Sequence, residues 1–242
     1  MRLINFMPNR IAVMQPYLFP YIGYYQLISA VDTFIQYDTA DYITGGWINR
    51  NNILLSGKPH RFTLPLQKAS QNKAICETTL IENLKPRKKI LKTIRHAYND
   101  APYFQPVFEL IQKILLHDQK NLATFLDHAL KETCAYLEVK TTLIRASDTP
   151  INMSLEREER LIDLTHKMGA QSYINPIGAK SEDLYHKERF EKAGLELFFI
   201  KTAPLNYDQG YDTFTPNLSI IDVMMFNTPQ KINTLLQKQR LI

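Results

Sequence analysis

The chain of 242 residues has a mass of 28.2 kDa, is 45% hydrophobic and carries a formal net charge of +5. This indicates a globular protein with a substantial core, and it excludes a membrane span, because no run approaches the roughly twenty apolar residues that a span needs. The N-terminal residues lack the apolar region and cleavage site of a signal peptide, and Cys76 and Cys134 are too isolated for a disulfide framework or a zinc knuckle. We therefore expect a cytoplasmic protein.

The first predicted elements are a strand, a loop, a helix and a second strand. Residues 11–14 form a short apolar run that ends at Gln15-Pro16, because proline holds the residue before it in extended geometry. Apolar side chains at helical spacing follow Gly23, and residues 34–37 return to a strand-like pattern that stops at Asp38. A unit of this kind builds a parallel sheet.

Polar and aromatic side chains gather where these two strands end. In open α/β sheets ligands bind beyond the carboxyl ends of the strands, so both loops are expected on the same side of the sheet. The three carboxamides beside an arginine in residues 49–52 suit a sugar, an amide or a phosphate. A turn and buried aromatic side chains would account for any one of these residues, but the whole cluster favours a site. The ligand-binding candidates are Gln15, Tyr17, Tyr21, Gly23, Tyr24, Tyr42, Trp47, Asn49 and Asn51, and the catalytic candidates are Asp38, Asp41 and Arg50.

A β-hairpin is predicted next. Residues 53–55 and 61–66 flank the turn signal Ser56-Gly57-Lys58-Pro59, and the hairpin would add antiparallel strands at one edge of the sheet. His60 follows the turn, either as an exposed side chain or as a further contact to the same ligand. Residues 75–81 alternate weakly and favour another strand.

The middle third is predicted to be helical, over residues 86–98, 103–115 and 122–137, with Asn121 as an N-cap. Basic residues between positions 85 and 95 indicate one solvated helix face, and this run is too short for a nucleic-acid footprint, so no nucleic acid is expected as a partner. The modest positive charge fits a small anionic ligand such as a sugar nucleotide. His117 and His128 lack the spacing of a zinc-binding pair, so no metal site is predicted.

The C-terminal third alternates strands and helices. Asn175 and Gly178 follow one of these strands and are expected to contact the ligand, because glycine permits a close backbone approach. The predicted fold is α/β: a mostly parallel sheet flanked by helices, with an antiparallel hairpin at one edge and a helical middle segment. We expect a single domain over residues 1–242 with a helical insertion at about 86–138. The last strands are expected over 141–146, 171–174 and 195–200, and the last helices over 157–168, 183–193, 219–226 and 231–237.

Six motifs are spread, in order, along nearly the whole chain: MQPYLFPYIGYYQLISAVDTFIQYD, GWINRN, FTLPL, AYNDAPYF, YINPIG and LSIIDVMMFN. This series resembles the WbqC-like protein family. The resemblance implies a role in the biosynthesis of O-antigen and other surface polysaccharides, with transfer of an acyl or aminoacyl group to a nucleotide-linked amino sugar. The chain departs from the family pattern at TADYITGG and at Leu84. These departures bear on which ligand the protein binds, and they leave the expected fold unchanged.

A weaker resemblance concerns the first strand, the proline-rich loop and the helix led by glycine. Nucleotidyltransferases and pantothenate synthetase-like ligases carry an HxGH motif at this place. Here Tyr21 and Tyr24 stand at the histidine positions. Tyrosine carries no positive charge, so the adenylyl-transfer mechanism does not carry over, and the likeness implies only a nucleotide-binding α/β topology.

Two functions are consistent with these residues. An acyl or aminoacyl transferase would use Asp38 or Asp41 as the base for the ammonium proton, and Asn49, Arg50 or Asn51 as donors to the oxyanion. No nucleophile triad is recognisable, so no covalent intermediate is predicted. Alternatively, an accessory protein of the same pathway would bind the sugar nucleotide without chemistry. The sequence indicates no particular cofactor.

Overall fold

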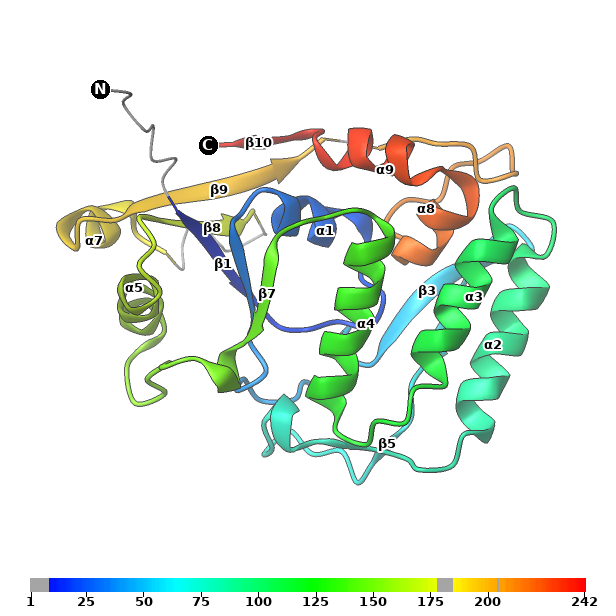
Figure 1. Cartoon of the computed structure of the whole chain (residues 1–242), viewed down its shortest axis with the longest axis horizontal. Coiled ribbons are helices and arrows are strands. Elements are labelled where there is room, and N and C mark those ends of the chain that lie inside the picture. The colour runs from blue at the N-terminus through cyan, green and yellow to red at the C-terminus, as the bar shows by residue number, and fades with distance from the viewer. Residues whose placement is uncertain (1–8, 178–184, 204) are drawn as a thin grey trace.

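The computed structural model describes residues 9–177, 185–203 and 205–242. Its centre is a six-stranded sheet with the order β10-β9-β8-β1-β2-β7 (Figure 1). Neighbouring strands are parallel except β10, which runs antiparallel to β9. The strands are β1 (Arg10–Met14), β2 (Thr33–Gln36), β7 (Thr142–Arg145), β8 (Ser172–Pro176), β9 (Glu196–Thr202) and β10 (Gln239–Leu241).

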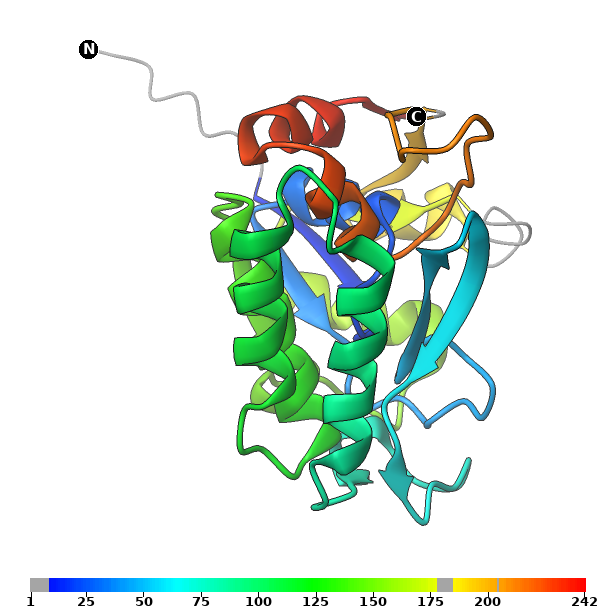
Figure 2. The same cartoon turned by 90° about the vertical axis from the view of Figure 1, so that its right-hand side faces the viewer.

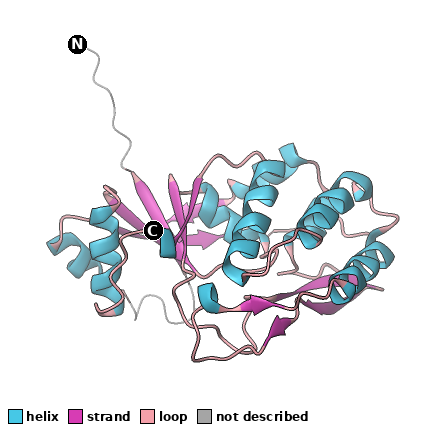
Figure 3. Cartoon of the chain, turned by 60° about the horizontal axis from the view of Figure 1, so that its bottom comes forward, coloured by secondary structure: helices cyan, strands magenta, loops and turns pink. Residues whose placement is uncertain are grey.

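Helices cover both faces of the sheet (Figure 3). Successive strand residues point to opposite faces, so Ala12 and Phe34 join the larger core while Ile11 and Ile35 join the smaller one. The smaller core is closed by α5 and α7, and the other helices pack around the larger one. The helices are α1 (Ile22–Ser29), α2 (Lys85–Tyr98), α3 (Phe104–Leu115), α4 (Leu122–Tyr136), α5 (Arg157–Lys167), α7 (Lys187–Lys192), α8 (Ile220–Phe226) and α9 (Pro229–Leu236).

The parallel strands have the order of a doubly wound sheet. From β1 the chain proceeds outward to β2 and β7, then returns to β8 on the other side of β1 and continues to β9. Ligands of such sheets bind where the order reverses, here beyond the carboxyl ends of β1 and β8. The predicted α/β fold with a mostly parallel sheet is confirmed, and it places the loop after β1 and the end of β8 beside this point.

Local sequence signals define several helix ends. The side chain of Asn121 accepts a hydrogen bond from the Thr124 amide at 3.0 Å, which confirms the predicted N-cap of α4. Thr228 caps α9 in the same way, through the Lys231 amide at 3.1 Å. Gly169 adopts a φ of +65° directly after α5, a left-handed conformation that glycine reaches without strain.

The predicted hairpin is confirmed as β3 (Arg50–Leu55) and β4 (Lys58–Thr63). Ser56 and Gly57 form its two-residue turn with φ values of +51° and +71°, the backbone twist that matches paired strands. The hairpin is a two-stranded sheet of its own, and the antiparallel strand at the edge of the main sheet is β10. The hairpin lies beside α2 (Figure 2), and its side chains Ile53 and Leu54 are buried.

The segment expected as a strand at 75–81 is largely irregular. It begins with a 3₁₀ turn, Ile75–Glu77, and only β6 (Thr79–Leu80) pairs with another strand, β5 (Leu66–Gln67). The Ile75 side chain is fully buried, so the apolar positions that suggested a strand are used to anchor a turn instead.

Arg87 corrects the prediction of a wholly solvated basic face on α2. The side chain is buried, and its guanidinium donates to the carbonyls of His117 at 2.9 Å and Gln119 at 3.1 Å. Burial lowers the pKa of Arg87. The lysines around it are exposed, so the face is solvated except at the residue that fastens α2 to the end of α3.

Candidate functional site

The loop after β1 is held in place by hydrogen bonds between its backbone and other parts of the chain. The Tyr24 hydroxyl, from α1, donates to the Gln15 carbonyl at 2.8 Å, and the Leu18 amide donates to the Ile48 carbonyl at 3.0 Å. The Ile220 amide at the start of α8 donates to the Pro20 carbonyl at 2.9 Å. The adjacent helix α1 and two segments distant in sequence, around Ile48 and Ile220, therefore fix this loop.

Phe19 at the centre of this loop has a left-handed backbone. Its φ is +44°, which is uncommon for a bulky residue and carries a cost of order 1–3 kcal/mol. The carbonyl of Phe19 accepts from Asn51 Nδ2 at 2.7 Å and from Ser219 Oγ at 2.8 Å, and its ring is buried. The surroundings thus hold a strained conformation, an arrangement concentrated at functional sites.

The fixed loop forms one wall of a cavity of about 390 Å³. Its size is within the range of small-molecule sites. The opposite wall comes from the loop that carries Trp47, which is 45% exposed, and from Thr202 at the end of β9. We call this cavity the aromatic cleft, and it is lined by Tyr17, Pro20, Tyr21, Trp47, Asn51, Thr202 and Asn217.

A second cavity, of about 430 Å³, adjoins the aromatic cleft and shares Tyr21, Thr202 and Asn217 with it. We call it the adjoining cavity. The first turn of α1 lines it through Gly23 and Gln26. The N-terminus of α1 has no side-chain cap and no acidic residue in its first turn. Backbone partners use part of it, because Tyr21 forms an antiparallel bridge with Ser219 and the Tyr24 amide donates to the Tyr21 carbonyl at 3.0 Å.

Gln26 provides a buried acceptor at the adjoining cavity. The side chain is completely buried and donates through Nε2 to the carbonyls of Leu235 at 3.0 Å and Lys238 at 3.1 Å. Its Oε1 atom has no partner among the residues that the structure describes. A buried acceptor without a donor is costly, so a ligand hydroxyl, amide or amine at this position would be favoured.

The tyrosines of the aromatic cleft are neutral hydrogen-bonding groups. Burial raises the pKa of Tyr17 and Tyr21, so both stay protonated at neutral pH. The ring of Tyr17 lies 5.5 Å from that of Tyr24, centroid to centroid, which supports it from behind. Among the described residues that line the two cavities none carries a charged side chain. The lining is therefore suited to an uncharged aromatic or sugar ring.

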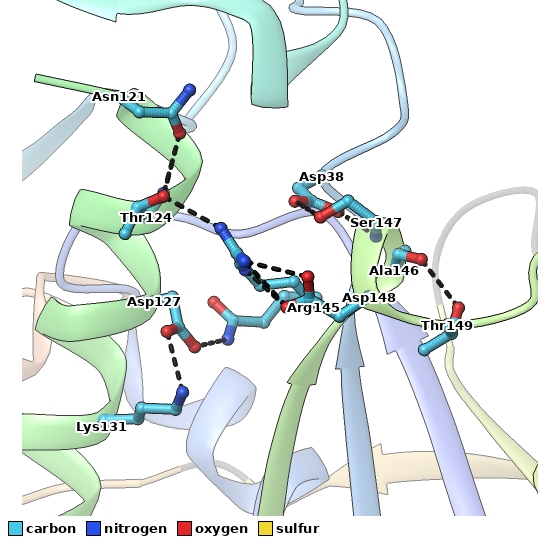
Figure 4. A network of polar contacts seen from close by, with 11 residues as sticks. Asp38, Asn121, Thr124, Asp127, Lys131, Arg145, Ala146, Ser147, Asp148 and Thr149 are labelled. Atoms are coloured by element: carbon cyan, nitrogen blue, oxygen red, sulfur yellow. Dashed lines mark hydrogen bonds and ion pairs between the residues drawn. The ribbon is translucent and has the colours of Figure 1, made fainter.

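Asp38 lies outside the lining of both cavities, in a polar network at the ends of β2 and β7 (Figure 4). It is completely buried, and its two carboxylate oxygens accept from the amide and the hydroxyl of Ser147 at 2.9 and 2.7 Å. Arg145 binds Asp148 and Thr124 in the same network. The carboxylate of Asp38 thus connects the ends of two strands.

The other candidates after β2 have mostly internal partners. The Tyr42 hydroxyl donates to Asn49 Oδ1 at 2.9 Å, and Asn49 Nδ2 donates to the Leu64 carbonyl at 2.7 Å. Asp41 is exposed and pairs through its backbone with residue 74. Arg50 is half-buried, and its Nε has no partner among the described residues. None of these four side chains lines the aromatic cleft or the adjoining cavity.

Three further candidates lie elsewhere. His60 is exposed and lines a separate groove between β4 and α2. Asn175, near the end of β8, is buried and donates to the Pro176 carbonyl at 3.0 Å. Gly178 lies outside the described residues. The structure thus brings together Tyr17, Tyr21, Trp47 and Asn51, with Gly23 beside them, while Gln15 and Tyr24 support the loop from behind.

The sequence did not point to Thr202, Asn217, Gln26 or Tyr207, which line the same two cavities. Thr202 and Asn217 reach the cleft from chain segments more than 150 positions away from Trp47, a contact that spacing alone does not reveal. Gln26 was hidden in an apolar helix, where a lone glutamine is the one recognisable signal.

A buried carboxylate lies behind Tyr207. Asp222, in the first turn of α8, accepts from the Tyr207 hydroxyl at 2.7 Å, from Gln209 Nε2 at 2.8 Å and from the Tyr98 hydroxyl at 2.8 Å. Burial raises the pKa of Asp222, and the three donors oppose this shift. The Tyr98 hydroxyl also accepts from the Leu54 amide at 2.9 Å, so the network joins α2, β3 and α8.

The fold is that of a doubly wound α/β protein, and the aromatic cleft, lined by uncharged side chains, lies at the carboxyl ends of β1 and β9. The chain belongs to the WbqC-like protein family, whose model matches residues 15–234. It is also similar to an uncharacterized protein of Mycobacterium tuberculosis, with 29% identity over 222 residues that cover 90% of this chain and 94% of the relative. No helix in the described part of the chain is long and apolar enough to cross a membrane.

Proposed function

We propose that the protein is a transferase of surface polysaccharide (O-antigen) biosynthesis that binds a nucleotide-linked amino sugar in the aromatic cleft. The observation that carries this proposal is the shared cavity of Tyr17, Tyr21, Trp47 and Asn51, four residues expected at a ligand site from the sequence. Aromatic faces suit the apolar faces of a sugar, and the exposed Asn217 amide in the same lining suits its hydroxyl groups. The reaction we propose is transfer of an acyl or aminoacyl group to the sugar amine.

The adjoining cavity offers places for the polar parts of the same ligand. The Gly23 amide in the first turn of α1 would donate to a phosphate of the nucleotide, because helix N-termini favour anions. Gln26 Oε1, which has no partner in the described structure, would accept a hydrogen bond from the sugar amine or a hydroxyl. Both groups lie at the same wall, next to Tyr21.

Acyl transfer to an amine needs a proton acceptor. The amine nitrogen bonds to the carbonyl carbon, the bond to the leaving group breaks, and the ammonium proton must leave. Asp38 is engaged by Ser147 and lies outside the cleft lining, so we assign this role to Tyr207 backed by Asp222. The Tyr207 oxygen would take the ammonium proton while its own proton moves to Asp222.

The proposal is tested by calorimetric titration of UDP-linked amino sugars into the wild type, Trp47→Ala and Met153→Ala. We expect an affinity loss of about tenfold for Trp47→Ala, equivalent to about 1.4 kcal/mol, and no change for Met153→Ala, whose side chain is about as exposed as that of Trp47 and lines none of the cavities. Equal affinities of the three proteins would remove the cleft as the sugar site.

Turnover separates the two candidate bases. With a sugar nucleotide that binds and an activated acyl donor, mass spectrometry detects the acylated sugar. Tyr207→Phe is expected to lower kcat by about a hundredfold or more, while Asp38→Asn keeps it within a few fold, since the amide can still pair with Ser147. The reverse pattern would return the catalytic role to Asp38.

A second candidate function is binding without chemistry, as an accessory protein of the same pathway. The observation in its favour is that none of the described residues lining the two cavities is charged. An accessory protein would show the same affinities and the same loss for Trp47→Ala, with no acylated product for any donor. The turnover measurement therefore decides between the two functions.

A further inference from the structure

A groove between β4 and α2 is separate from the cavities described above. It has a volume of about 640 Å³, within the range of small-molecule sites, and it shares no lining residue with the aromatic cleft or the adjoining cavity. Its lining residues come mainly from the hairpin strand β4 and from α2. We call it the basic groove.

The rim of the basic groove is positively charged. It carries His60 and Arg61 from β4 and Lys89, Lys92 and His96 from α2, all exposed. No Asp or Glu is among its lining residues, and none of these five side chains forms an ion pair within the described ranges. The charges of Arg61, Lys89 and Lys92 are therefore not neutralised by the protein itself, which creates a local positive potential.

The floor of the groove is apolar. The described side chains below the rim include two prolines and three larger apolar residues, of which Phe62 and Ile90 are buried. A ligand that matches both parts would carry negative charge at one end and an apolar or aromatic moiety at the other. The apolar lining consists of Leu55, Phe62, Pro65, Pro86 and Ile90.

We propose that the basic groove binds a small phosphate ester with an apolar or aromatic moiety, as a second ligand of the protein. Arg61 and the two lysines would bind the phosphate, because a guanidinium pairs with phosphate oxygens in a bidentate manner and an ammonium binds as a point charge. The apolar floor would contact the rest of the ligand.

The basic groove is next to the aromatic cleft without being part of it. The Arg61 guanidinium lies 5.4 Å from the centroid of the Trp47 ring, and Trp47 lines the aromatic cleft. Arg61 also receives support from Asn52, to which its Nε donates at 3.3 Å. The inference rests on the groove alone and stands whether or not a sugar nucleotide binds in the cleft.

A small ligand fits the groove better than a nucleic acid. Protein surfaces that bind single strands extend over several nucleotides and expose aromatic side chains on which bases stack. The aromatic ring in the lining, Phe62, is buried below the rim. The charge is confined to one concave region with an apolar floor.

The test is calorimetric titration with ADP, and with adenosine as the uncharged probe, at a salt concentration of about 0.05 M, where charge screening is weak. We expect ADP to bind with a Kd below about 1 mM and adenosine to bind at least about tenfold more weakly. In the double variant Lys89→Gln/Lys92→Gln the ADP affinity is expected to fall about tenfold or more.

Two controls locate the binding. Lys85→Gln/Lys88→Gln removes the same charge from the same helix outside the groove and should leave the ADP affinity within about twofold. Tyr17→Ala, in the aromatic cleft, should also leave it unchanged. No ADP binding, equal losses in the two lysine double variants, or a loss confined to Tyr17→Ala would each overturn the proposal.

Discussion

Gly23 in the first turn of α1 is predicted to control ligand binding through the ring of Tyr21. A Cβ atom on Gly23 would lie 2.3 Å from one carbon of that ring and 2.8 Å from its hydroxyl oxygen, closer than any stable contact. Gly23→Ala therefore forces the Tyr21 ring to rotate away. Because Tyr21 is 38% exposed, the ring can move into solvent without disturbing the core.

Gly23→Ala should weaken ligand binding without lowering the stability of the protein. Alanine is favoured over glycine inside a helix by roughly 0.5–1 kcal/mol, so the free energy of unfolding should stay equal or rise. The ligand loses an aromatic contact worth about 0.5–1.5 kcal/mol, which corresponds to a roughly two- to twelvefold weaker affinity for the sugar nucleotide. Urea denaturation and calorimetric titration measure the two quantities.

A double-mutant cycle with Tyr21→Ala isolates the cause. If the displaced ring explains the loss, Gly23→Ala should cost no affinity in a protein that already lacks the Tyr21 ring. An additive loss would refute the reasoning, because it would show that Gly23 acts through the backbone of α1 and not through Tyr21. A fall in stability of Gly23→Ala would contradict it as well.

Three further outcomes are expected. Tyr98→Phe should lower the free energy of unfolding by about 2–4 kcal/mol in urea denaturation. The variant removes one of the three donors to the buried Asp222 carboxylate and the acceptor of the Leu54 amide. A change below about 1 kcal/mol would contradict this expectation. Asp222→Asn removes a carboxyl group whose pKa is raised in the folded state. The wild type should therefore be most stable relative to this variant at about pH 4, and this difference in the free energy of unfolding should decrease as the pH rises. A difference that grows with pH would show that the pKa of Asp222 is lowered instead. Asn51→Ala should cost about 1–3 kcal/mol, measured by thermal unfolding, because it leaves the Leu18 carbonyl without its donor and the Phe19 carbonyl with the Ser219 hydroxyl alone. A neutral result would show that the strained loop does not depend on Asn51.

The fold was largely predictable because its elements carry local signals. The proline after β1, the N-caps Asn121 and Thr228 and the glycine after α5 each mark an end through backbone chemistry. The short edge strand β10 was missed because its pairing with β9 is a tertiary contact over a three-residue segment. Arg87 was assigned to a solvated face because its three carbonyl partners lie about thirty positions further along the chain.

The site was predictable in part. The aromatic residues after β1 and Trp47 were recognised because ligands bind beyond strand ends, and the structure brings them to one cavity. Strand ends alone do not tell which polar side chains remain free. Asp38, Asn49 and Asn51 all follow strands or start one, yet each uses its polar atoms to hold the backbone or another side chain. Only the hydrogen-bond partners distinguish such a residue from one that faces a ligand.

The Tyr207 and Asp222 pair shows the opposite case. The segment 207–215 is rich in aromatic and acidic residues, and Asp222 lies in an apolar helix. Their hydrogen bond at 2.7 Å forms because α8 begins beneath that loop, which places a buried carboxylate behind a cavity wall. No spacing rule connects the two residues, so the pair becomes visible only in the fold.

The central claim is tested most directly by a crystal structure of the protein with a UDP-linked amino sugar. The account predicts the sugar ring between Tyr17, Tyr21 and Trp47, with its amine or a hydroxyl within hydrogen-bond distance of Gln26 Oε1. A sugar bound instead beside Asp38 and Ser147, at the ends of β2 and β7, would contradict it.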